Sequence, residues 1–365
     1  MTAKPVVGWW WPPVAAVLIF AAPWPATLIE TAFSRGWYRL VQSILTTISN
    51  LTPWTWFDVL VLVAVVLCVR RLVVLIRERR QRGWWGIGGE AVRRTLRGSG
   101  YVALAFLLCW GLNYRRTSLI SVLSATPPVT ASVDELRQLA IDAAAVAART
   151  RTAAQKQLLS YDDIARRLPE PFNRALAHVG RPRLIVPGRP KYTVFTPFFT
   201  RAGVTGMVDP FALESMVHPD LLPFERPFVL AHEWAHLAGQ ADEAEASAVG
   251  WSACMRGDDP LVYSAAMYLL VETSAALPTR VWREVLVTLD PGVREDLRAL
   301  ANRWKLIQPS VRDASFKVYD GYLRANAVED GVRSYSRALQ LILLPTLRGQ
   351  LIDLRSGPVD PTHRP

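Results

Sequence analysis

Three apolar runs near the start of the chain constrain its fold more than any other sequence feature. Each contains about 20 mostly uncharged residues, the length that an α-helix needs to cross the hydrocarbon core of a membrane. The runs cover residues 10–29, 57–76 and 100–119. Tryptophan and tyrosine side chains lie near their ends, as in the aromatic belts of membrane proteins. We therefore predict that residues 1–120 form a membrane domain with three transmembrane helices.

The first run is the least regular of the three. Proline lacks the backbone N–H that a helix needs, and prolines stand near both ends of this run, at Pro12, Pro13, Pro23 and Pro25. A cleaved signal peptide is the alternative interpretation. We disfavour it because Lys4 is the only charged residue before the run and no clean small-x-small cleavage site follows.

The positive charge of the chain is concentrated in this same segment. Residues 1–120 carry 14 basic and 4 acidic side chains, whereas residues 121–365 carry 28 and 27. A protein that binds nucleic acid would carry its basic excess on the folded domain, so we expect no nucleic-acid partner. Nine arginines lie in the loop 70–97, which the positive-inside rule places in the cytoplasm. The N-terminus is then cytoplasmic, and residues 121–365 are extracytoplasmic.

The remaining residues, 121–365, are enough for one sizeable domain. Ser132 and Glu135 form the pattern of a capping box that opens a long Ala-rich helix, and helical periodicity returns after Pro227. Three short β-rich runs, at 184–186, 192–195 and 204–208, indicate one small sheet. The predicted fold class is therefore mainly α with a small β-sheet.

The motif that carries chemistry is His232-Glu233-Trp234-Ala235-His236. Pro227 suits the first turn of a helix and Gly239 suits its C-terminal cap, so the motif is expected on a helix. Two histidines four residues apart lie on one face and can bind the same metal ion. Glu233 is placed to accept a proton from a water molecule on that metal, as a general base.

A catalytic zinc site usually has a third protein ligand. The downstream helical stretch offers Glu243 and Glu245, which point about 200° apart on a helix, so only one of them can face the metal. We favour Glu243 because Ser247 follows one turn later on the same face as a hydroxyl partner for the site. Glu245 remains the alternative ligand.

At this point the chain resembles an uncharacterised family of bacterial membrane proteins with three N-terminal spans and a gluzincin-type HExxH domain. The resemblance rests on five stretches: residues 110–115, 206–217, 227–228, 319–326 and 331–336, together with an acidic motif that begins at Glu243. It implies a zincin-like (gluzincin) α+β domain, a Zn²⁺ cofactor, peptidase activity and a location in the bacterial inner (cytoplasmic) membrane. Two departures are Leu237, where the family commonly has Gln, and Ser247, where it has Asn or Asp.

The resemblance also implies a strand that binds substrate backbone by strand addition before the metal helix. It falls on Val208–Val217 and includes Val208, Pro210, Phe211, Glu214 and Val217. A carbonyl under attack further needs a donor for its developing negative charge. Four residues are unranked candidates for this donor: His218, Tyr322, Tyr335 and Arg324.

The sequence therefore predicts a membrane-anchored zinc-dependent metallopeptidase. His232, His236 and Glu243 would hold the metal, and Glu233 would pass a proton from water to the leaving amine. Its expected partners are the lipid bilayer and a peptide or protein substrate near the membrane surface. The alternative is a non-hydrolytic membrane sensor or assembly protein whose zinc site is structural or binds a peptide.

Overall fold

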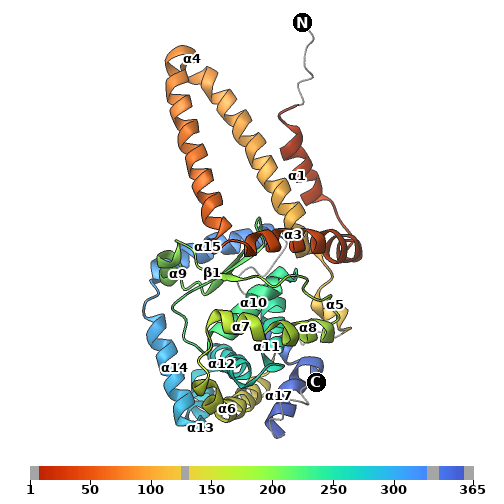
Figure 1. The fold of residues 1–365 in the computed structure, drawn as a ribbon, viewed down its shortest axis with the longest axis vertical. Coiled ribbons are helices and arrows are strands. Elements are labelled where there is room, and N and C mark those ends of the chain that lie inside the picture. Colours follow the sequence, from red (N-terminus) through yellow and green to blue (C-terminus); the bar gives the residue numbers. More distant parts are fainter. Residues whose placement is uncertain (1–7, 125–130, 327–336, 357–365) are drawn as a thin grey trace.

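The computed structural model describes residues 8–124, 131–326 and 337–356. A globular body carries two long helical arms and one shorter helix that project from the same end (Figure 1). The described residues are mainly helical with one three-stranded sheet, which confirms the predicted fold class.

The first apolar run does not form one straight helix. Helix α1 covers Trp11–Ala21 and is followed by a short non-helical stretch. Three helical elements come next: α2 (Ala26–Leu28), the π-helix η1 (Ile29–Trp37) and α3 (Tyr38–Asn50). The helical axis bends by 112° at this break. The predicted span 10–29 is thus wrong as a single helix, because Pro23 and Pro25 supply no backbone N–H there.

The second run begins the longest helix, α4 (Trp56–Cys109), which turns back on itself to make the two arms in Figure 1. Its first arm, Trp56–Glu78, is long and apolar enough to cross a membrane, and none of its apolar window is buried in the protein. This agrees with the predicted span 57–76. The loop expected at 70–97 is instead helical.

The third predicted span, 100–119, is helical within α4 only in its first half, and it is not among the helices long and apolar enough to cross a membrane. Helix α4 ends at Cys109, and the 3₁₀-helix η2 (Gly111–Arg115) and short α5 (Leu119–Val122) follow. Gly111, Leu112 and Asn113 are buried in the globular body, so this segment packs against protein. Among the described residues, one helix qualifies as a span by length and composition, or two if the bent N-terminal pair counts as one.

Helix α1 packs along the returning arm of α4. The rings of Trp11 and Tyr101 meet edge to face at 5.5 Å between centroids. At Gly100 the two backbones approach so closely that a Cβ atom would lie 2.3 Å from the Pro13 nitrogen. Glycine at this position therefore allows the contact between the helices.

The helices of the globular body follow the sequence patterns closely. The predicted capping box between Ser132 and Glu135 is present at the start of α6. Leu168 separates α7 from α8 where Pro169 opens a new helix. Apart from the helices described with the candidate site, the body contains α6 (Val133–Lys156), α7 (Tyr161–Arg167), α8 (Pro169–His178), α9 (Thr196–Ala202), α12 (Asp259–Ala276), α13 (Thr279–Thr288), α14 (Pro291–Trp304), α15 (Pro309–Ala325), α16 (Arg337–Ile342) and α17 (Pro345–Ser356).

The small sheet has the strand order β1-β3-β2. Strand β3 (Glu214–Val217) lies in the centre, parallel to β1 (Pro190–Lys191) and antiparallel to β2 (Gly206–Asp209). The predicted substrate strand Val208–Val217 is therefore two strands and a turn. Val208 lies on the outer strand β2, Pro210 and Phe211 lie in the turn, and Glu214 and Val217 lie on the central strand. The β-rich runs 184–186 and 192–195 form no strand, since β1 ends at Lys191.

One hydrophobic core runs through the globular body and includes residues from before position 120. Tyr38, Trp110 and Leu119 belong to the same cluster of buried side chains as Trp234 and Trp251. The division at residue 120 stays a prediction, but the packing joins the base of the projecting helices to the rest of the body.

Candidate metal centre

The two motif histidines lie on α10 (Arg226–Leu237), with Pro227 in its first turn as predicted. Gly239 ends the helix with a φ of +81°, a left-handed conformation that glycine adopts without strain. The N–H of Gly239 donates to the carbonyl of His236 at 2.8 Å, and the N–H of Gln240 to that of Ala235 at 2.9 Å. This turn directs the chain back toward the face of α10 that carries His232 and His236.

The next helix, α11 (Glu243–Met255), packs closely on α10. Asp242 caps its start by accepting hydrogen bonds from the N–H groups of Ala244 and Glu245 at 3.0 and 3.1 Å. A Cβ atom at Gly250 would lie 2.9 Å from the backbone nitrogen of His232, so the glycine permits the close contact between α10 and α11. The first residue of α11, Glu243, consequently faces the histidines.

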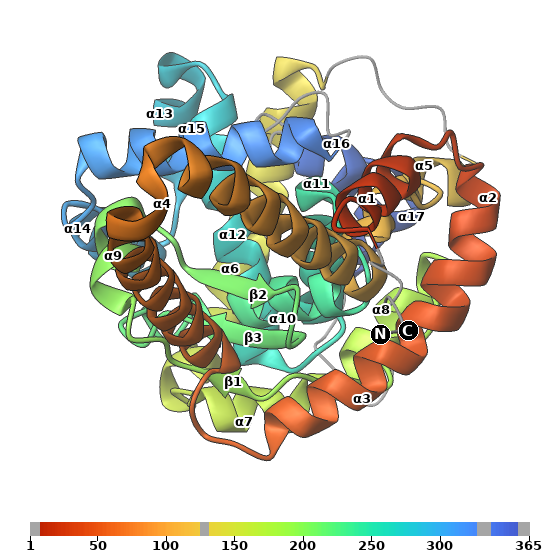
Figure 2. The ribbon, with the colours of Figure 1, turned by 90° about the horizontal axis from the view of Figure 1, so that it is seen from above.

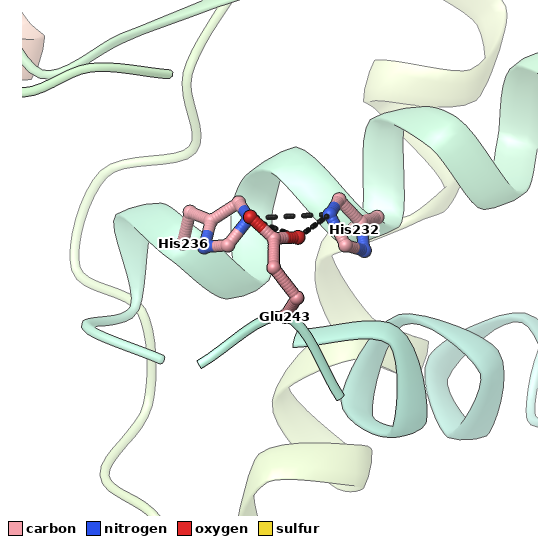
Figure 3. Close-up of side chains that lie close together, drawn as sticks. All are labelled: His232, His236 and Glu243. Carbon is pink, nitrogen blue, oxygen red and sulfur yellow. Dashed lines mark hydrogen bonds and ion pairs between the residues drawn. The ribbon is translucent and has the colours of Figure 1, made fainter. Parts of the chain in front are cut away.

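The three predicted ligands converge on one point (Figure 3). The Nε2 atoms of His232 and His236 are 3.1 Å apart, and Oε2 of Glu243 lies 3.2 Å from the first and 3.4 Å from the second. One ligand atom from each residue lies within 4.8 Å of the other two. Two imidazoles and one carboxylate form a donor set that suits Zn²⁺.

Each histidine is oriented through its other ring nitrogen. The carbonyl of Gln240 lies 2.7 Å from Nδ1 of His236, and the hydroxyl of Ser247 lies 3.2 Å from Nδ1 of His232. These partners leave both Nε2 atoms pointing at Glu243, as a metal site requires. Burial lowers the pKa of His232, which favours the neutral ring that can bind a metal.

The carboxylate of Glu243 is held in its charged form. Burial alone would raise its pKa, but His236 and His232 lower it well below the usual value. The hydroxyl of Tyr319, on α15, donates a hydrogen bond to Oε1 of Glu243. The other oxygen, Oε2, is buried without a hydrogen-bond partner and faces the two Nε2 atoms. The residues present therefore fit a metal ion.

The alternative ligand Glu245 lies elsewhere. Its carboxylate accepts a hydrogen bond from the N–H of Leu119 at 2.6 Å and pairs with Arg181 at 3.3 Å. Arg181 also pairs with Glu30 at 3.0 Å. Glu245 thus belongs to a buried ion-pair network, and Glu243 is the acidic residue that the structure brings to the histidines.

Glu233 points from α10 toward strand β2. A Cβ atom at Gly206 would lie 2.4 Å from its Oε1, so the carboxylate lies directly against that strand. Its Oε2 is buried without a hydrogen-bond partner. Burial raises the pKa of Glu233 to about 8, which places its proton exchange near neutral pH.

Comparison with known proteins identified a protein family that the chain matches. The model of a family described as "Protein of unknown function (DUF3810)" matches residues 33–343. This chain belongs to the DUF3810 family. No curated protein and no solved structure matches the chain.

The match to DUF3810 includes both helices of the candidate metal centre and the whole of α4. It also begins within η1, so α3 is part of the family region. The description of the DUF3810 family states no activity.

The remaining predicted residues of the DUF3810 chain divide into three groups. Tyr322 lies near the site, since it stacks on Tyr319 at 5.9 Å between ring centroids and burial raises its pKa to about 12. His218 uses both ring nitrogens elsewhere, with Thr200 and with the N–H of Asp220, and Arg324 pairs with Asp320 on the same helix. Tyr335 lies outside the described residues.

Sequence reasoning missed Tyr319 as a partner of the ligand Glu243. It lies three residues before Tyr322, on the same side of α15, and that spacing was the available signal. It also missed three side chains that hold the end of α10. Tyr38 donates to the carbonyl of Leu237 at 2.9 Å, Trp110 to that of His236 at 3.3 Å and Arg116 to that of Gly239 at 2.9 Å.

Proposed function

We propose that this chain is a membrane-anchored zinc-dependent metallopeptidase that hydrolyses peptide bonds. One observation carries the proposal: His232, His236 and Glu243 converge on one point while Glu233 lies beside them on α10. Three ligands leave a fourth position of a tetrahedral zinc ion open, as in catalytic zinc sites. A glutamate one residue after the first histidine is the feature that distinguishes a hydrolytic site from a structural one.

A bound zinc ion would supply Lewis acidity, which lowers the pKa of water and polarises a substrate carbonyl. Glu233 would accept the proton of the attacking water and pass it to the leaving amine. Its buried Oε2, which has no hydrogen-bond partner among the described residues, supports this role, because that oxygen is free to accept a proton. His236 and His232 would hold the ion through Nε2.

The outer strand β2 is the proposed binding element for substrate backbone. Among the described residues, β2 pairs with β3 on one side and with no strand on the other. Gly206 of this strand touches Glu233, so a peptide added along β2 would pass beside the general base. This arrangement is the basis for proposing a zincin-like (gluzincin) organisation.

The proposed location is the bacterial inner membrane, with three spans, a cytoplasmic N-terminus and an extracytoplasmic catalytic domain. The exposed apolar side chains of the first α4 arm support membrane insertion. The contacts of Tyr38 and Trp110 with the end of α10 connect the metal centre to the end of the body from which the arms project (Figure 1). We infer that the substrate is a peptide or protein near the bilayer surface.

The test uses the full chain in detergent micelles with a fluorescent peptide library and zinc analysis. Glu233→Gln should lower turnover by about 100-fold or more while zinc content stays unchanged. Glu284→Gln, at an exposed position on α13, is the matched control and should keep full activity. Full activity in Glu233→Gln would overturn the mechanism. A wild type that binds zinc but cleaves no library peptide would favour the non-hydrolytic sensor or assembly protein.

A further inference from the structure

Helix α3 has its polar and apolar faces reversed relative to a surface helix of a water-soluble protein. Its buried face carries Tyr38, Gln42, Thr46 and Ser49. An ordinary surface helix buries its apolar stripe and exposes its polar face. In α3 the polar face is the one that contacts the globular body.

Each polar side chain on the buried face makes a hydrogen bond to the body. Gln42 donates to the carbonyl of Val186 at 2.6 Å, and Thr46 donates to that of Leu213 at 2.7 Å. Ser49 donates to the carboxylate of Glu214 at 3.0 Å. These bonds, with that of Tyr38 to the end of α10, fix which side of α3 faces outward.

The outward face is a continuous apolar stripe, which consists of Trp37, Leu40, Ile44, Ile48 and Leu51. The spacing of three or four residues places all five side chains on one side of the helix. Between 47% and 77% of the surface of each is exposed. Such a contiguous exposed apolar face indicates a binding surface.

The position of α3 identifies what covers this stripe. Helix α3 lies at the end of the body from which the arms project (Figure 1), and seen from above it runs along one side of the body (Figure 2). The helical axis bends by 112° between α1 and the α2–α3 segment. The chain enters the exposed apolar first arm of α4 at Trp56, five residues after the end of the stripe at Leu51. The stripe therefore lies where the membrane surface must be if the arms are inserted.

We propose that α3 is an interfacial helix whose stripe inserts into the outer boundary of the bilayer and holds the globular body against the membrane surface. Trp37 and Trp54 suit this depth because indole rings partition to the interface. The hydrogen bond from Tyr38 to Leu237 then joins the lipid-bound helix directly to α10. The inference concerns lipid contact and does not depend on peptidase activity.

The test places an environment-sensitive fluorophore at single cysteines in the full chain, reconstituted in phosphatidylcholine–phosphatidylglycerol vesicles. Cys68 and Cys109 are replaced by alanine, and buried Cys254 is kept. The probe is attached at Ile44→Cys in the stripe, and at Val287→Cys as a control. Val287 is an apolar residue that is 75% exposed, against 49% for Ile44, and it lies on α13 at the end of the body away from the arms.

Doxyl-labelled lipids should quench the probe at position 44 several-fold more than at position 287, and aqueous iodide should do the reverse. Equal quenching by iodide at both positions would overturn the proposal. A probe at position 44 that neither quencher reaches, with protection that rises with the protein-to-lipid ratio, would show that a second copy covers the stripe and would also overturn it.

Discussion

The hydroxyl group of Tyr38 donates a hydrogen bond of 2.9 Å to the carbonyl oxygen of Leu237, the last residue of the helix that carries both motif histidines. Tyr38 is the first residue of α3 and is fully buried within the body. A side chain from the base of the projecting helices thus satisfies a backbone group that the end of α10 leaves free.

Replacing Tyr38 by phenylalanine should destabilise the protein by about 1–2 kcal/mol, because the buried carbonyl of Leu237 loses its partner. The expected result is a lower thermal unfolding midpoint in detergent micelles. Tyr101→Phe is the control, since Tyr101 is exposed on α4 and should leave the midpoint unchanged. Equal midpoints for Tyr38→Phe and the wild type would contradict the contact.

Ser247 orients the ring of His232, so Ser247→Ala should weaken zinc binding by about tenfold or more. The measurement is competition for zinc with a chromophoric chelator, using the full chain. Ser274→Ala is the matched control, because the hydroxyl of Ser274 donates to the carbonyl of Val271 on its own helix. Unchanged affinity in Ser247→Ala would argue against its role at the metal centre.

Gly206 leaves room for the carboxylate of Glu233. In Gly206→Ala the new methyl group would lie 2.4 Å from Oε1 of Glu233, so the carboxylate must move. We expect a loss of turnover with unchanged zinc content, because the three metal ligands are untouched. Gly321→Ala is the control, since no atom lies within 4 Å of a Cβ there. Equal turnover in the two variants would show that the position of Glu233 against β2 is unimportant.

The raised pKa of Glu272 makes the stability of the folded protein depend on pH. Burial raises its pKa to about 7, so the folded state binds a proton more tightly than the unfolded state. Stability should therefore fall as pH rises from about 4.5 to 7, and the loss persists above that range. Glu272→Gln should stabilise the protein at pH 8 by about 1–3 kcal/mol, measured by thermal unfolding. Glu284→Gln, half exposed, should show no such gain.

The cluster of His232, His236 and Glu243 was largely predictable from sequence because its determinants are local. Pro227, Gly239 and the four-residue spacing of the histidines specify one helix and one face. The opposed directions of Glu243 and Glu245 on a helix allowed only one to be a ligand, and the structure puts Glu243 there. Ser247 followed from the same helical geometry.

The membrane segment was less predictable because hydropathy counts residues and ignores what they pack against. Gly111 to Asn113 are apolar enough to extend a span, yet they are buried in the body as part of a 3₁₀-helix. The contact of Tyr319 with Glu243 joins residues 76 positions apart, and the spacing of Tyr319 from Tyr322 indicates only that the two tyrosines share one side of α15. The reversed faces of α3 depend on hydrogen bonds to Val186 and Leu213, which only the folded chain brings together.

Elemental analysis of the full chain, purified in detergent without chelator, tests the central claim most directly. The wild type is compared with Glu243→Gln and Glu245→Gln, each of which keeps the shape of the side chain. Glutamine at position 243 can still accept the hydrogen bond of Tyr319, and glutamine at position 245 that of the Leu119 N–H. We expect one zinc ion per chain in the wild type and in Glu245→Gln, and none in Glu243→Gln. A wild type without zinc, or a Glu243→Gln variant that binds as much as the wild type, would contradict it.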